Sequence, residues 1–239
     1  MSGKDFIPLP RIEQEALALL AEYGRCVEPL TEPPVPVDDI FEAHLHFDFR
    51  FADLAAKYGG TNVLAEIFIK DKKVVVDKSL DPEEHPPMLG RYNFTLAHEI
   101  GHWVLHRNEV FAVSSEPDMF GFVSNPVICR DGSLEPHEWQ ANAFASNLLM
   151  PKEWVWREWL KIFPNGEPLN ITDEMERKAE YMRMERRRYE LTSDIARDMK
   201  YIFNVSGVAM HRRLCEMKLL EIGPHQPTLF DNASFPPQG

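Results

Sequence analysis

The sequence predicts an α+β fold, in which helices accompany a small β-sheet and a helical region follows toward the C-terminus. Three observations support this fold class. Apolar residues recur at helical spacing in three segments, residues 10–24, 94–106 and 135–151. Two short runs rich in β-branched residues, 63–69 and 73–77, predict neighbouring strands. Helical patterns then dominate from residue 154 to residue 222.

The first helix is expected over residues 10–24, ending at Gly24. A proline-rich connector separates it from a short second helix over residues 37–43, which we expect an aspartate to cap. The two strands come next along the chain. We expect Asp71 and Lys72 to join them through a tight hairpin turn.

The helix over residues 94–106 follows Asn93, a favourable N-cap, and carries the pattern H-E-x-x-H. His98 and His102 occupy one helical face, with Cα atoms about 6 Å apart. That spacing lets both imidazoles reach one zinc ion at about 2.0–2.1 Å. Glu99 lies between them and can serve as a general base toward water at the metal. The pattern therefore predicts a metal-dependent hydrolase, most simply a peptidase.

His106 is the nearest further histidine, but helix geometry argues against it as the third ligand. It lies about 12 Å of helical rise from His98, too far for three imidazoles to share one ion. The glycine that precedes a third histidine in H-E-x-x-H-x-x-G-x-x-H is also absent. His106 is therefore interpreted as a residue at the helix end, with a contact behind a ligand or to substrate as the alternative.

A better third ligand lies in the helix over residues 135–151, which has a proline in its first turn and another at its end. Glu138 lies near the start of this helix and would complete a two-histidine, one-glutamate site, leaving a fourth position for water. Asn142, one turn later, could hold a ligand by a hydrogen bond. The residues alone leave the choice open among several acidic side chains in range: Glu116, Asp118, Glu135 and Glu138.

The connection over residues 107–135 is either a lid over the site or a surface excursion with one short strand at 121–124. Farther on, a tryptophan-rich helix over 154–160 is expected to pack in the core. A charged helix from about Thr172 carries arginines that we interpret as a solvated face. Residues 193–222 are similar to a helix-turn-helix, but the small and apolar residues early in its second helix favour a structural or docking role over DNA reading.

Two motifs together resemble the ImmA/IrrE-type metallopeptidases. They are F-T-L-A-H-E-I-G-H, and E-x-x-A-N-x-F-A-x-x-L-L-M-P downstream of it. The resemblance covers about residues 10–160 well and the C-terminal part more loosely. It implies a zincin-like domain with zinc bound by His98, His102 and Glu138, and with Glu99 as the base.

The domain organisation expected from these patterns has two parts. Residues 1–162 would form the zincin-like metallopeptidase domain. Residues 163–239 would form a helical C-terminal region, with the helix-turn-helix-like segment at 193–222 and a flexible tail from about residue 224.

The resemblance also implies a narrow protein substrate. A zinc-dependent endopeptidase of this kind would cleave a helix-turn-helix repressor encoded nearby and so control stress or mobile-element genes. The alternative is a non-catalytic or antitoxin-like binding module that sequesters a partner, as in toxin–antitoxin pairs. The intact Glu99 favours catalysis. The donor that would stabilise the oxyanion is open, with His106 and Tyr92 as candidates.

The composition of the chain disfavours several other classes of function. The chain has 239 residues, is 44% hydrophobic and carries a formal net charge of −12. The acidic balance predicts no direct nucleic-acid binding and disfavours a transcription factor acting through residues 193–222. No apolar run reaches the roughly 18 residues of a membrane span, and the N-terminus lacks a signal-peptide layout. The three cysteines are far apart, which fits a reducing cytoplasm.

Overall fold

The computed structural model describes residues 6–27, 29–60, 63–113, 127–130, 136–185 and 190–223; of residues 109–113 and 127–130 it describes the backbone alone. The architecture is α+β, as predicted, and mostly helical. The longer helices are α1 (Leu9–Cys26), α4 (Leu89–Val113), α5 (Pro136–Leu149), α6 (Lys152–Ile162), α7 (Thr172–Met184), α8 (Asp194–Phe203) and α9 (Gly207–Glu216). Shorter helical turns are α2 (Val37–Asp39), η1 (Ile40–His44), α3 (Leu54–Lys57), η2 (Lys78–Leu80) and η3 (Pro86–Met88).

A four-stranded sheet has the order β1-β3-β2-β4. Its strands are β1 (Asp48–Ala52), β2 (Val63–Phe68), β3 (Lys73–Asp77) and β4 (Val127–Arg130). Strand β2 is antiparallel to both β3 and β4, whereas β1 is parallel to β3. Strands β2 and β3 confirm the two predicted strands, and β1 was not predicted. A second, two-stranded sheet pairs β5 (Leu169–Asn170) with β6 (Leu220–Glu221) in parallel.

The turn between β2 and β3 contacts α4 through Lys72. Lys72 has a positive φ of 48° in the turn, as a tight reversal requires. Its Nζ donates to the carbonyl of Leu45 at 2.9 Å and lies 5.3 Å from the ring centroid of Trp103. The guanidinium of Arg107 lies 5.4 Å from the same centroid. Arg107 and Trp103 both belong to α4, so it is the Lys72 contact that joins the sheet to the helix carrying H-E-x-x-H.

Helix boundaries differ from the predictions in three places. Helix α4 begins at Leu89 rather than after Asn93, because the prolines of η3 lead directly into it. Asn93 is inside the helix, and its Nδ2 donates to the carbonyl of Asn204 at 2.9 Å, so its assignment as an N-cap was wrong. The second helix is capped by Pro36 without a side-chain bond and continues as a π-helix, so the aspartate cap was wrong as well. Helix α1 continues past Gly24 to Cys26.

Helices α8 and α9 are joined by a short turn in which Asn204 adopts a left-handed conformation, with φ 49°. Serines cap both helices, since Ser193 accepts from the amide of Ala196 and Ser206 from the amide of Ala209. The turn packs on the first residues of α4. A Cβ added to Gly90 would lie 2.5 Å from the carbonyl oxygen of Val205, a distance that only glycine avoids.

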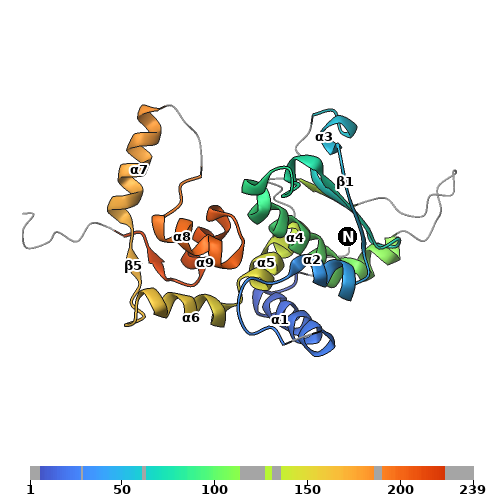
Figure 1. Ribbon diagram of the computed structural model, residues 1–239, viewed down its shortest axis with the longest axis horizontal. Coiled ribbons are helices and arrows are strands. Elements are labelled where there is room, and N and C mark those ends of the chain that lie inside the picture. Colours follow the sequence, from blue (N-terminus) through green and yellow to red (C-terminus); the bar gives the residue numbers. More distant parts are fainter. Residues whose placement is uncertain are drawn as a thin grey trace, which may run out of the picture.

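Arg213 of α9 makes a second connection to the rest of the fold. Its side chain is 3% exposed. Its Nε donates to the carbonyl of Met150 at 3.0 Å, and its terminal nitrogen donates to Asn147 Oδ1 at 2.9 Å. These bonds fasten α9 to the C-terminal end of α5. Figure 1 shows α6 to α9 at the left and the larger sheet at the right, with α4 and α5 between them.

One cluster of buried apolar residues runs through both parts of the chain, from Ile12 through Ile100 and Phe144 to Leu214. The expected domain boundary after residue 162 stays a prediction. Other expectations fall outside the described residues: the flexible tail from about 224, the strand at 121–124, and most of the expected lid. Within the part of the chain that is described, no helix combines the length and apolarity needed to cross a membrane.

Candidate metal centre

The site is built where α4 and α5 cross closely. A Cβ added to Gly101 would lie 3.1 Å from the Cα of Ala141 and 3.2 Å from the Cβ of Phe144. The two helices therefore approach through a residue without a side chain on one and a small residue on the other. This close approach brings the start of α5 over the face of α4 that carries the two histidines.

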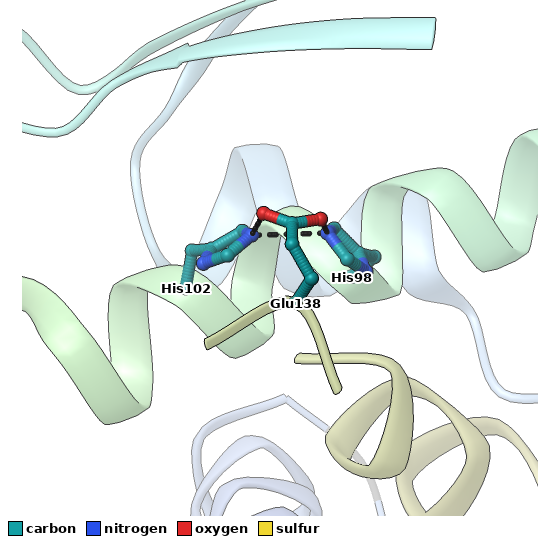
Figure 2. Close-up of side chains that lie close together, drawn as sticks. All are labelled: His98, His102 and Glu138. Carbon is teal, nitrogen blue, oxygen red and sulfur yellow. Dashed lines mark hydrogen bonds and ion pairs between the residues drawn. The ribbon is translucent and has the colours of Figure 1, made fainter. Parts of the chain in front are cut away.

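His98, His102 and Glu138 meet at this crossing, each with its side chain almost fully buried. The two Nε2 atoms lie 3.0 Å apart. Each Nε2 lies 3.2 Å from a different oxygen of Glu138, and Figure 2 shows the carboxylate spanning the two rings. Ligands placed about 2.0–2.1 Å from a tetrahedral metal are about 3.3 Å from one another. The three donors thus have the separations that one metal ion requires.

The protonation of these groups fits a cation. Burial lowers the pKa of His102 to about 4, and nearby His98 acts in the same direction against the pull of Glu138. Burial alone would raise the pKa of Glu138, but interactions with His102 and His98 outweigh it and hold that pKa well below its usual range. At neutral pH an uncharged His102 imidazole and a Glu138 carboxylate therefore converge with His98 at this site. A divalent metal with nitrogen and oxygen ligands satisfies that arrangement.

Asn142 orients the first of these ligands, as the sequence predicted that it could. Its Oδ1 lies 3.0 Å from His98 Nδ1. Because an amide oxygen only accepts hydrogen bonds, the ring proton of neutral His98 is on Nδ1. Its Nε2 then presents a lone pair to the metal position, which is the usual way in which a partner fixes the tautomer of a histidine ligand.

Glu99, the predicted base, follows His98 on α4 and is 0% exposed. Successive helical residues are about 100° apart, so its side chain projects beside the seam of the two histidines rather than along it. A carboxylate this deeply buried in a globular protein is costly unless charge or hydrogen bonds compensate for it, and a neighbouring cation supplies such compensation.

His106 is not a member of the three-residue cluster, in agreement with the argument from helical rise. Its interpretation as a helix-end residue was wrong, since α4 continues to Val113. The side chain is instead buried, with Nδ1 3.2 Å from His102 Nδ1 and Nε2 2.8 Å from Gln140 Oε1. The alternative of a contact behind a ligand is what the structure shows.

Gln140 was missed by sequence reasoning, although a signal was present. It lies one turn before Phe144 on the buried face of α5, and a polar residue on such a face needs a partner.

The two candidate oxyanion donors are engaged elsewhere. His106 is hydrogen-bonded as described above. Tyr92 is buried, and its hydroxyl donates to Asp38 Oδ1 at 2.6 Å. Burial, with that bond, raises the pKa of Tyr92 well above its usual range. Of the acidic alternatives to Glu138, three lie outside the described residues: Glu116, Asp118 and Glu135.

Part of the chain matches a known protein family. Residues 83–169 match the family model described as Peptidase_M78, IrrE N-terminal-like domain. That stretch contains α4 and α5 and so includes His98, Glu99, His102 and Glu138. No curated protein matches the chain. Residues 83–169 are thus similar to the IrrE N-terminal-like domain, and both this family match and the buried cluster of His98, His102 and Glu138 suggest a metallopeptidase.

Proposed function

We propose that the protein is a zinc-dependent endopeptidase. The convergence of His98 Nε2, His102 Nε2 and the Glu138 carboxylate within 3.0–3.2 Å of one another carries this proposal. Two imidazoles, one carboxylate and a fourth position open to water form the donor set of catalytic zinc sites. Structural zinc sites, by contrast, use four protein ligands, often cysteines.

The reaction assigns a separate task to each group. A zinc ion at this position would polarise the scissile carbonyl and lower the pKa of water toward about 7. Glu99 accepts the proton of the attacking water and then delivers it to the leaving amine. His102 stays neutral, so its lone pair remains available to the metal, and Asn142 directs the Nε2 of His98 to the same position. Burial favours this neutral state, since it disfavours the charged form of His102.

The proposed substrate is a specific regulatory protein, of the helix-turn-helix repressor class, whose cleavage switches stress or mobile-element genes. This choice of substrate class rests on the resemblance of the motifs around His98 and Glu138 to the ImmA/IrrE-type metallopeptidases. The net charge of −12 fits a protein partner better than nucleic acid. We place the reaction in the cytoplasm, where free thiols such as Cys26 and Cys215 persist.

Helices α8 and α9 are proposed to support the peptidase fold rather than to read DNA. Their turn is pressed against Gly90, and Asn204 accepts from Asn93. Met210 and Leu214 are fully buried. A reading helix would instead present exposed polar residues near its start to the major groove.

The test separates catalysis from binding. Purified protein should contain about one equivalent of zinc, and His98→Ala should lose it. Glu99→Gln preserves side-chain shape, so it should retain zinc but lose cleavage of a co-expressed repressor by about 10²–10⁴-fold. Glu83→Gln, an exposed glutamate upstream, is the matched control and should retain both.

Two results would decide against the proposal. If the unchanged protein contains no zinc, the proposed metal site is wrong. Full function of Glu99→Gln in cells, with zinc still bound, shows that the protein acts by sequestering a partner, as an antitoxin-like binding module would.

A further inference from the structure

A second pair of side chains lies behind His102, on the side of its ring opposite the metal position. His106 Nδ1 lies 3.2 Å from His102 Nδ1, and His106 Nε2 lies 2.8 Å from Gln140 Oε1. His106 is 3% exposed and Gln140 is 1% exposed. Neither side chain belongs to the ligand cluster, so their burial and pairing need a separate explanation.

The donors and acceptors in this series of hydrogen bonds follow from the Gln140 amide oxygen at its end. Gln140 Oε1 can only accept, so the proton of neutral His106 is on Nε2. His106 Nδ1 is then an acceptor, and His102 must donate to it from Nδ1. The Nε2 of His102 is left with a lone pair, directed at His98 and Glu138. The opposite direction would put a proton on His102 Nε2, which cannot then bind a metal.

We infer that His106 and Gln140 are positioning residues that fix the metal-binding tautomer of His102. The inference rests on the zinc site proposed above and extends it from α4 into the interior of α5. Partners of this kind typically contribute about 10–100-fold to metal affinity.

The two histidine ligands differ in how replaceable their partners are. His98 is oriented by Asn142, which is exposed, so water can take the place of that amide. His102 is oriented by two fully buried groups that water does not reach. The buried pair therefore determines whether His102 is ready to bind before the metal arrives.

Three variants distinguish positioning from mere structural support. His106→Phe and Gln140→Met each remove one polar group while nearly preserving its volume, and the double variant removes both. Zinc affinity is measured by competition with a chromophoric chelator, and the ligand geometry by the visible absorption of the Co²⁺-substituted protein. The stability of the metal-free protein is measured by urea unfolding. His85→Phe, which removes an exposed histidine ahead of α4, is the matched control.

We expect the variants to affect the stability of the metal-free protein and its zinc affinity differently. His106→Phe leaves both Gln140 Oε1 and His102 Nδ1 without their partner, whereas the double variant leaves His102 Nδ1 alone, so metal-free stability should recover in part from His106→Phe to the double variant. Zinc affinity should stay about 10–100-fold below that of the unchanged protein, with an altered cobalt spectrum, because His102 Nδ1 still lacks its acceptor. The control should bind zinc normally.

The contrary outcomes are distinct. A double variant that binds zinc as tightly as the unchanged protein, with the same cobalt spectrum, overturns this inference and leaves the proposed function standing. Recovery of affinity together with stability shows a structural role only and also overturns it. Failure of the unchanged protein to bind zinc overturns the proposed function, and this inference with it.

Discussion

Replacing Gly101 with alanine should force α5 away from α4 and weaken metal binding. The added Cβ would lie 3.1 Å from both the Cα and the carbonyl oxygen of Ala141, and 3.2 Å from the Cβ of Phe144. Carbon atoms in contact prefer about 3.5–4.0 Å. The crowded atoms are backbone or directly attached to it, so no side chain can rotate away and the helices must separate by a few tenths of an ångström.

The net cost follows from two opposing effects. Alanine in place of glycine inside a helix gains about 1 kcal/mol from helix propensity. Overpacking a close-packed contact costs about 1–3 kcal/mol. The difference is a loss of about 1 kcal/mol, or a fall in Tm of about 2–4 °C for a protein of this size. Glu138 moves with α5, so if this strain opposes closure of the ligands, zinc affinity falls by about fivefold.

The assay compares Gly101→Ala with Gly207→Ala. Gly207 is the first residue of α9, and a Cβ added there has its nearest neighbour at 3.7 Å, an ordinary contact. The control should keep its Tm or gain up to about 1 kcal/mol of stability. Thermal unfolding and chelator competition are measured on both variants. If Gly101→Ala raises Tm as the control does and binds zinc normally, the crossing is not as tight as described.

Two further predictions concern a buried charge and pH. Arg213→Met leaves two buried acceptors unpaired, so it should lower the free energy of unfolding by about 1–3 kcal/mol in urea unfolding. Arg212→Met, which changes the exposed neighbouring side chain, should change that free energy by no more than about 0.5 kcal/mol. Equal losses in the two variants would contradict the buried hydrogen bonds of Arg213. In the metal-free protein, the folded pKa of His102 is about 4 against 6.5 for the free side chain, so between these values only the unfolded chain binds the proton. Its free energy of unfolding should therefore fall by up to about 3 kcal/mol as pH falls from 7 to 4, and His102→Gln should flatten that slope; an unchanged slope would refute the assignment.

Local patterns predicted the elements that carry the site. The histidine spacing, the prolines bounding α5 and the β-branched runs of β2 and β3 are each readable within about ten residues of sequence. The choice of Glu138 among several acids depended on family resemblance, because no local signal states which carboxylate lies over His98 and His102. The structure brings Glu138 to them through the helix crossing at Gly101.

The errors share a non-local cause. Asn93 satisfies the local rule for an N-cap, but its partner Asn204 is 111 residues away and the helix starts earlier. Strand β1 pairs in parallel with β3, although β2 lies between them in the sequence. Apart from the alternation of Phe49 and Phe51, β1 has no fully buried apolar residue that would mark it as a strand. Gln140 was passed over because its partner, His106, belongs to another helix.

The contact between Gly90 and Val205 has a consequence for biosynthesis. A ribosome makes the chain from the N-terminus at about 5–20 residues per second, so the ligand residues emerge well before α9 exists. The start of α4 is covered only when the turn after α8 docks on it, and Arg213 then fastens the end of α5. The cluster of His98, His102 and Glu138 is therefore supported on both of its helices only after α9 has been synthesised.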